Sequence, residues 1–207
     1  MEIMRKIIFA FMAICMATTL SAQTTANEWV KQLESSMGER YAYTLNVKVA
    51  SGDSEAMLAG RLMVEGDSYY MSLEAMEVYS NGKLRYEVNN ERKEVTEDRV
   101  DLTSHDLLTN PTRAFKFAPE EFKMTLKFSQ NDEIAGIVLT PRDKDYGITA
   151  ILLYLVREGD KVYPKQIAYD YDGDTILISL TEYAAEGWKM PKWSEANYKA
   201  YDIVSFL

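Results

Sequence analysis

Apolar and polar residues alternate along most of the chain with a period of two, the pattern of strands that bury one face. From Tyr41 to Val49 the odd-numbered positions are apolar, and from Met57 to Val64 the even-numbered positions are. Because the polar turns between such segments are short, we expect antiparallel strands that pair in sequence order. Further strands are predicted over residues 122–128, 134–139, 149–156, 161–169 and 175–183.

The segment from Tyr69 to Val95 predicts a meander of three short strands. An Asn-Gly pair at 81–82 suits a two-residue turn, because both residues tolerate a positive φ. In the middle strand Leu84, Tyr86 and Val88 alternate with charged residues. This strand is therefore expected to have one apolar face, which another part of the chain or a ligand must cover.

Two helices are predicted beside these strands. Thr25-Ala26-Asn27 can cap a helix that ends near Gly38. The alternation stops between Val100 and Glu121, where we expect a short helix over Pro111–Phe117, since proline is tolerated in the first turn. The first helix is amphipathic, and its apolar stripe consists of Trp29, Val30, Leu33 and Met37.

The length of the chain indicates how many domains it forms, and its charge indicates which partners it can bind. The chain has 207 residues, of which 47% are hydrophobic, enough for one domain with a substantial core. Its formal net charge is −9. Binding to nucleic acid relies on clustered Lys and Arg that neutralise phosphates, so we expect no nucleic-acid partner.

The N-terminus predicts a secretory signal peptide over residues 1–22. Arg5 and Lys6 precede an apolar run from Ile7 to Leu20, which is too short for a comfortable membrane span. The small residues Ser21 and Ala22 follow this run, and we expect cleavage after Ala22. Residues 23–207 would form a single exported domain.

Cys15, the one cysteine of the sequence, lies within the predicted signal peptide. It could in principle carry a lipid anchor, but Ile14 stands where a lipobox needs a small residue. An ordinary apolar residue of the leader is the favoured interpretation. The mature chain then has no disulfide, no thiolate metal site and no cysteine nucleophile.

Few residues point to catalysis. His105 is the single histidine and lies in a polar loop, so we expect a surface or capping role for it. The acidic run Asp170–Asp174 fails the EF-hand pattern, because Thr175 and Thr181 occupy the sixth and twelfth positions. We predict no catalytic residue, no metal and no cofactor, and interpret the chain as a protein that is not an enzyme.

Several short motifs, taken in their order along the chain, resemble those of a known family. A leading amphipathic helix is followed by Gly60–Val64, Tyr69–Met71, Ser80–Tyr86, Asn110-Pro111 and a closing segment Tyr198–Phe206. In this order and spacing the chain resembles the LolA-like periplasmic carriers of outer-membrane lipoproteins. Each motif is weak alone, and together they cover nearly the whole mature chain.

The resemblance implies a mainly β fold with short helices: an unclosed antiparallel half-barrel capped by the N-terminal helix and a lid helix. The implied function is a periplasmic carrier, a monomer that takes lipoprotein acyl chains from an inner-membrane lipoprotein-releasing complex to an outer-membrane acceptor. Ala114 and Phe115 would belong to the lid. The wall of the acyl-chain cavity would consist of Leu62, Val64, Met71, Leu73, Leu84, Tyr86 and Val88.

One position departs from the family pattern. Family members often have a basic residue after the strand that corresponds to Gly60–Val64, where it is implicated in holding the lid closed. Here Glu65-Gly66 stands in that place. An alternative function is a non-transport module of the same fold that senses lipoproteins or binds a protein partner. Such a module would have a fully packed core and would bind its partner through a surface patch.

Overall fold

The computed structural model describes residues 24–207. The predicted signal peptide, its cleavage point and Cys15 lie outside the described residues. Within the described part, no helix is long and apolar enough to cross a membrane.

Residues 24–207 form one sheet of 12 strands in the order β12-β6-β5-β4-β3-β2-β1-β11-β10-β9-β8-β7. All pairs are antiparallel except β12 with β6, and β12 and β7 are the two edges, so the sheet is not closed. The predicted unclosed antiparallel architecture is confirmed. The segment Tyr69–Val95 differs in having four strands where three were predicted, because the chain also turns at Glu74-Ala75, where Glu74 has a positive φ of 50°. The strands are β1 (Arg40–Ser51), β2 (Ser54–Glu65), β3 (Ser68–Leu73), β4 (Met76–Ser80), β5 (Leu84–Asn89), β6 (Glu94–Arg99), β7 (Phe122–Gln130), β8 (Ile134–Pro141), β9 (Ala150–Glu158), β10 (Lys161–Tyr171), β11 (Asp174–Ala184) and β12 (Asp202–Ser205).

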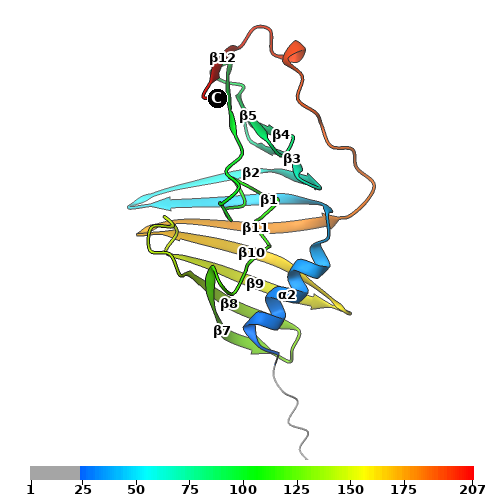
Figure 1. The fold of residues 1–207 in the computed structure, drawn as a ribbon, viewed down its shortest axis with the longest axis vertical. Helices are drawn as coiled ribbons and strands as arrows, with labels where there is room; N and C mark the ends of the chain where they lie inside the picture. Colours follow the sequence, from blue (N-terminus) through cyan, green and yellow to red (C-terminus); the bar gives the residue numbers. More distant parts are fainter. Residues whose placement is uncertain (1–23) are drawn as a thin grey trace, which may run out of the picture.

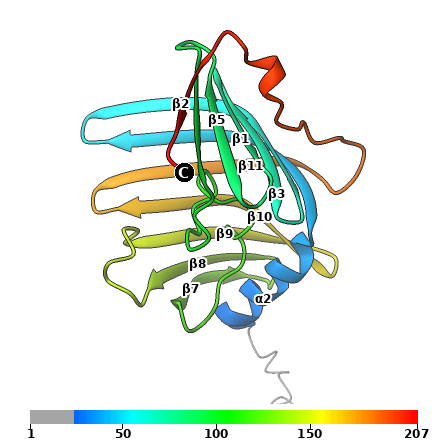
Figure 2. The same cartoon turned by 45° about the horizontal axis from the view of Figure 1, so that its top comes forward.

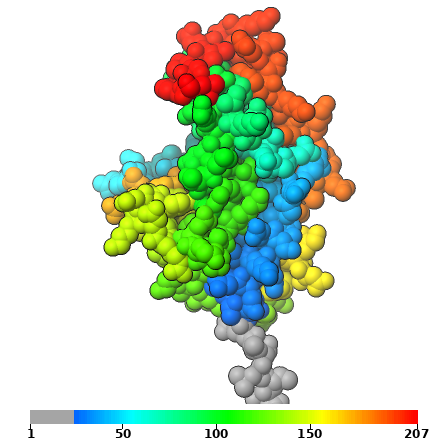
Figure 3. Space-filling view, viewed as in Figure 1, coloured from blue at the N-terminus to red at the C-terminus, as the bar shows by residue number. Residues whose placement is uncertain are grey.

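The sheet is curved, and one of its sides is covered by two other parts of the chain. Figure 2 shows β3 and β5 turned steeply relative to β1 and β11. Helix α2 (Ala26–Met37) and residues 100–121, which we name the strap, lie on the same side of the sheet (Figure 1). In the space-filling view the blue helix and the green strap lie next to each other on this side (Figure 3). We call it the inner side.

Helix α2 forms as the sequence predicts. Thr25 is the N-cap, its hydroxyl accepts from the backbone N–H of Glu28, and the Glu28 carboxylate accepts from the backbone N–H of Thr25. This capping box satisfies backbone donors that the first turn leaves free. Gly38 ends the helix at a positive φ of 63°, which glycine adopts without steric cost. Trp29 and Leu33 are fully buried, and the helix packs on β10 and β7.

The strap contains turns where a helix over Pro111–Phe117 was predicted. The backbone N–H groups of Arg113, Ala114 and Lys116 each donate to the carbonyl three residues earlier, and the segment has no α-helical assignment. The physical reason is the burial of both Phe115 and Phe117. Two residues apart on a helix, these rings would point in different directions, and only one could enter the core.

The two sides of the sheet carry separate apolar clusters. The inner core joins α2, the strap and the inward faces of β1–β4 and β7–β11. Residues 185–201, which we name the tail, lie on the outer side of β3–β6 and contain the short 3-10 helix η1 (Glu195–Asn197). The predicted closing strand over 198–206 is present as β12, limited to residues 202–205.

Candidate functional site

The structure brings part of the predicted cavity wall together on the inner side. Leu62, Val64 and Met71 are buried in the inner core, and Leu73 is half-buried against it. These residues lie on the paired strands β2 and β3, where Leu62 is opposite Met71. They form one continuous apolar surface under the strap.

Strand β5 does not contribute its apolar residues to this surface. Tyr86 and Val88 belong to the outer cluster with Tyr79 and Tyr198, and Leu84 has the same strand parity. The predicted alternation of β5 is present, but its apolar face points outward. The reason is the tail, which supplies a second apolar cover that strand periodicity alone does not reveal. The aromatic residues of the tail, Trp193 among them, are the signal in the sequence that such a cover exists.

The inner side of β5 presents Arg85 and Glu87, which line an open groove beneath the strap. The volume of this inner groove is about 380 Å³, within the range of small-molecule sites. Its apolar lining consists of Leu58, Met71, Leu73, Ala75, Met76, Val78 and Leu108, and its polar lining consists of Glu74, Arg85, Glu87, Asn89 and Glu91. The apolar floor of the groove is continuous with the packing of the inner core, because five of its residues belong to that core or pack against it: Leu58, Met71, Leu73, Val78 and Leu108.

The predicted lid residues lie in the strap and are part of the core. Ala114 and Phe115 are both buried. Phe115 contacts Tyr41 edge to face at 6.0 Å between ring centroids, and it lines a second hollow of about 230 Å³ at the end of α2. The strap therefore covers the inner side as predicted for the lid, in a different backbone conformation.

Tyrosine hydroxyls from the sheet hold the backbone of the strap. Tyr41 donates to the Pro111 carbonyl at 2.9 Å and Tyr69 to the Thr109 carbonyl at 3.1 Å. Tyr169 accepts from the backbone N–H of Leu107 at 2.8 Å and donates to the His105 carbonyl at 3.1 Å. Tyr171 donates to the carboxylate of Asp106. Burial raises the pKa of Tyr169 well above its ordinary value, so the phenol stays protonated and able to donate.

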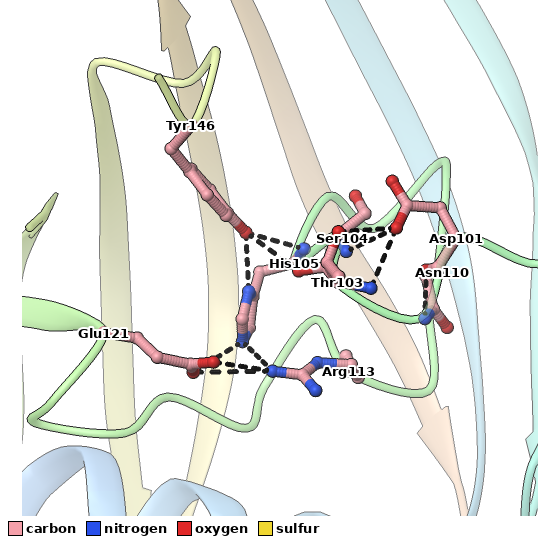
Figure 4. A network of polar contacts seen from close by, with 8 residues as sticks. All are labelled: Asp101, Thr103, Ser104, His105, Asn110, Arg113, Glu121 and Tyr146. Atoms are coloured by element: carbon pink, nitrogen blue, oxygen red, sulfur yellow. Dashed lines mark hydrogen bonds and ion pairs between the residues drawn. The ribbon is translucent and has the colours of Figure 1, made fainter. Parts of the chain in front are cut away.

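A second set of contacts clamps the two ends of the strap to each other and to the loop after β8 (Figure 4). His105 Nδ1 lies 2.6 Å from the Tyr146 hydroxyl, which also accepts from the backbone N–H of His105 at 3.0 Å. On its other edge, His105 Nε2 lies 3.0 Å from Arg113 Nη2 and 3.3 Å from Glu121 Oε2. Arg113 Nη2 donates to Glu121 Oε1 at 3.1 Å. We name His105, Arg113, Glu121 and Tyr146 the clamp.

The expectation that His105 lies at the surface is wrong. Its side chain is 1% exposed, stacked on Phe117 at 5.5 Å and edge to face with Phe122 at 5.0 Å between ring centroids. Burial, and next the positive charge of Arg113, lower the pKa of His105, while Glu121 opposes the shift. A neutral imidazole accepts through one nitrogen and donates through the other, which suits its place between Tyr146 and the Arg113–Glu121 pair.

The arrangement around His105 suits a structural clamp. The His105 ring is almost fully buried, whereas general acid–base catalysis needs a group within reach of its substrate. Within residues 24–207, no group of three or more His, Cys, Asp or Glu residues is arranged to hold a metal ion.

Glu65, at the position of the family's lid latch, takes part in a different contact. Its carboxylate accepts from Arg40 Nε at 3.0 Å. Arg40 also donates to the carbonyls of Ala185 and Trp188, and its guanidinium lies 4.0 Å above the Trp188 ring. This group therefore fastens the start of the tail, while the strap is held by the tyrosines and the clamp.

An open antiparallel sheet that wraps a helix and a strap on its inner side is the architecture that the sequence resemblance implies. The fold is thus the one expected from the resemblance to LolA-like carriers. No protein-family model matches the sequence, and no curated protein matches it.

Solved structures similar to this chain have low sequence identity. An uncharacterized conserved protein from Thermus thermophilus has 12% identity and a TM-score of 0.51 over 87% of this chain and 98% of that one. A LolA superfamily protein from Nitrosomonas europaea has 11% identity and a TM-score of 0.44 over 80% and 95% of the two chains. The lipoprotein LppX of Mycobacterium tuberculosis has 8% identity and a TM-score of 0.46 over 79% and 96%. At these identities the likeness concerns the fold alone.

Proposed function

We propose that the protein is an exported carrier that binds the acyl chains of lipoproteins on its inner side and moves them through the periplasm from the inner to the outer membrane. The observation that supports this most is the inner groove. It is largely apolar, about 380 Å³ in volume, and its apolar lining is packed against the inner core. Acyl chains require such a surface, because each CH₂ removed from water contributes about 0.8 kcal/mol.

The strap is suited to act as a displaceable cover. Its backbone is held by the hydroxyls of Tyr41, Tyr69 and Tyr169 rather than by a sheet ladder or its own helix. Hydrogen bonds of this kind contribute about 1 kcal/mol each on balance, because water can replace them when the groups become exposed. A ligand that enters from the groove displaces the strap only if its acyl chain replaces the apolar contacts of Leu107, Phe115 and Phe117, which are buried in the inner core.

The remaining elements of the proposal come from the sequence. Residues 1–22 predict export, and the resemblance implies an inner-membrane lipoprotein-releasing complex as donor and an outer-membrane acceptor as partners. A monomer without catalytic residues, cofactor or metal is sufficient for this role. Transfer requires only that the ligand bind to the carrier and leave it again.

The proposal is tested by transfer of a lipid-modified test protein from vesicles into solution, measured by vesicle flotation with purified residues 23–207. We expect Leu108→Glu to abolish transfer, because it places a charge in the apolar lining of the groove. Leu102→Glu is the matched control, since Leu102 is also in the strap but 63% exposed. Absence of transfer by the folded wild-type protein, or equal transfer by the two variants, would contradict the proposal.

The filled inner core favours the second candidate, a non-transport module of the same fold that senses lipoproteins or binds a protein partner. Trp29, Leu33, Leu107 and Phe115 occupy the inner side between the sheet and its covers. A folded protein that takes up no acyl ligand but forms a stable complex with another protein would support this alternative.

A further inference from the structure

Strand β12 forms one edge of the sheet, and the apolar side chains along it are exposed. Within residues 24–207 it pairs on one side only, with β6, and it lies at the top of the molecule in Figure 1. The exposed fraction is 42% for Ile203, 41% for Val204, 65% for Phe206 and 57% for Leu207. An edge of this kind can pair with a strand of another molecule.

The opposite edge, β7, has features that disfavour such pairing. Its register with β8 shifts between Leu126 and Phe128, and Lys123 and Lys127 are exposed along it. Irregular pairing and edge lysines both oppose edge-to-edge association. Strand β12 has neither, since its register with β6 is continuous and residues 203–207 include no charged side chain and no proline. One edge is therefore protected and the other is available.

The backbone of β12 also directs hydrogen-bonding groups away from the sheet. The backbone N–H of Phe206 donates to the carbonyl of Glu97 in β6 at 2.9 Å. Successive residues of a strand direct their N–H and C=O groups to alternate sides, so those of Ser205 point toward the free edge, as do those of Ile203. A partner strand could satisfy these groups.

We propose that β12 pairs antiparallel with β12 of a second copy of this chain, with the two-fold axis at Ser205. Residues opposite each other in such a pair share one face of the sheet. The register places Ile203 opposite the second copy's Leu207, and Val204 opposite its Phe206. The segment is thus self-complementary. Its four exposed apolar side chains cover one another, and none of the five side chains is charged, although the chain is acidic overall.

The two-fold pairing uses the β12 edge of both copies, so association stops at the dimer. Residues 203–207 do not line the inner groove, and the dimer therefore leaves that groove open. A pair of short edge strands buries less surface than a standard stable interface. We therefore expect a reversible dimer of micromolar affinity.

The first test is sedimentation of purified residues 23–207 over a range of micromolar concentrations. The wild type should show a reversible equilibrium between monomer and dimer. Ser205→Pro removes the outward N–H and leaves the N–H that bonds β6 in place, so it should weaken the dimer roughly tenfold or more, because a hydrogen bond is lost in each copy. Ser205→Ala keeps the N–H and is the matched control, with unchanged dimerisation.

The second test measures the register with cysteine crosslinks, since residues 23–207 contain no cysteine. A mixture of Val204→Cys and Phe206→Cys should form disulfide-linked dimers on mild oxidation, because opposite Cα atoms at this kind of position lie about 4.5 Å apart. Either variant alone should crosslink much less. Its two cysteines would then be diagonal neighbours about 7–8 Å apart, beyond the usual disulfide range.

Each possible failure has a distinct meaning. A monomer at every concentration would overturn the proposal and leave the β12 edge to a different protein. A dimer that Ser205→Pro leaves intact would overturn it as well, since another surface would then hold the two copies. Equal crosslinking by the mixture and by the single variants would contradict the register centred on Ser205. None of these results affects the transfer test of the carrier proposal.

Discussion

The strands β3 and β4 are covered on both sides by other parts of the same chain, and the two covers are built differently. On the outer side the tail packs by aromatic stacking: Trp193 lies parallel to Tyr86 at 4.4 Å and to Tyr198 at 5.0 Å between ring centroids. On the inner side the strap is fixed by tyrosine hydroxyls, by the clamp and by the burial of Leu107, Phe115 and Phe117 in the core, and it leaves an open groove. The outer cover thus depends on ring stacking, whereas the inner cover combines deep apolar burial with hydrogen bonds that water can replace when the strap moves.

The largest effect is expected for Tyr169→Phe on the inner side. The change removes the hydroxyl that serves both the Leu107 N–H and the His105 carbonyl, and it leaves both groups buried and unpaired. At about 1–3 kcal/mol per unpaired group, we expect a loss of about 3 kcal/mol in the free energy of unfolding. Denaturant unfolding measures the loss, and amide hydrogen exchange should localise it to the strap. Tyr154→Phe, on the outer side beside Phe128, is the control and should cost less than about 0.5 kcal/mol.

A smaller effect is expected for Trp193→Ala on the outer side. The variant removes a half-buried ring stacked between Tyr86 and Tyr198, and we expect a loss of about 2 kcal/mol. Limited proteolysis should show the tail cut first, while hydrogen exchange in the strap stays as in the wild type. Lys192→Ala, at the exposed neighbouring position, serves as control. Loosening of the strap in Trp193→Ala would show that the two covers are not independent.

Solution pH should change the stability of the inner cover more than that of the outer cover. The reason is His105, a member of the clamp whose pKa is shifted by folding. Its pKa is lowered in the folded protein, so the unfolded chain binds a proton first as the pH falls. Stability is therefore highest above the ordinary histidine pKa of about 6.5 and decreases as the pH falls from there toward the lowered folded value. The groups that face the ring are Arg113, Glu121 and Tyr146. Unfolding free energies measured from pH 7.5 to 5.5 should decrease in the wild type and less in His105→Gln. If the unfolding free energies of the wild type and of His105→Gln fell equally with pH, His105 would be excluded as the cause of the pH dependence.

The sequence predicts the strands and α2 well because neighbouring residues determine them. The alternation around Leu45 and Leu62, both fully buried, sets which side of each strand enters the core. The capping box of Thr25 and Glu28 similarly lies within four residues. Such local patterns need no knowledge of the rest of the fold.

Features that depend on distant partners could not be predicted in the same way. Tyr86 faces outward because Trp193, far later in the chain, covers it. His105 is buried because Phe122 and Tyr146 enclose it, although its neighbours in sequence are polar. The strap has no helix over Pro111–Phe117 because the core takes up both Phe115 and Phe117, whose rings a helix would point in different directions.

The smallest effect is expected at Glu65, where the family pattern has the lid latch. Glu65 pairs with Arg40 at 3.0 Å, but the two side chains are 53% and 37% exposed, and exposed ion pairs contribute about 0–1 kcal/mol. Glu65→Gln should therefore change the free energy of unfolding by less than about 0.5 kcal/mol and leave acyl-ligand binding unaltered. Arg113→Gln is the informative comparison, because it removes a member of the clamp and should increase hydrogen exchange in the strap. If Glu65→Gln loosened the strap as much as Arg113→Gln, the latch would lie at the position that the family pattern indicates. The assignment of the Arg40–Glu65 pair to the tail would then fail.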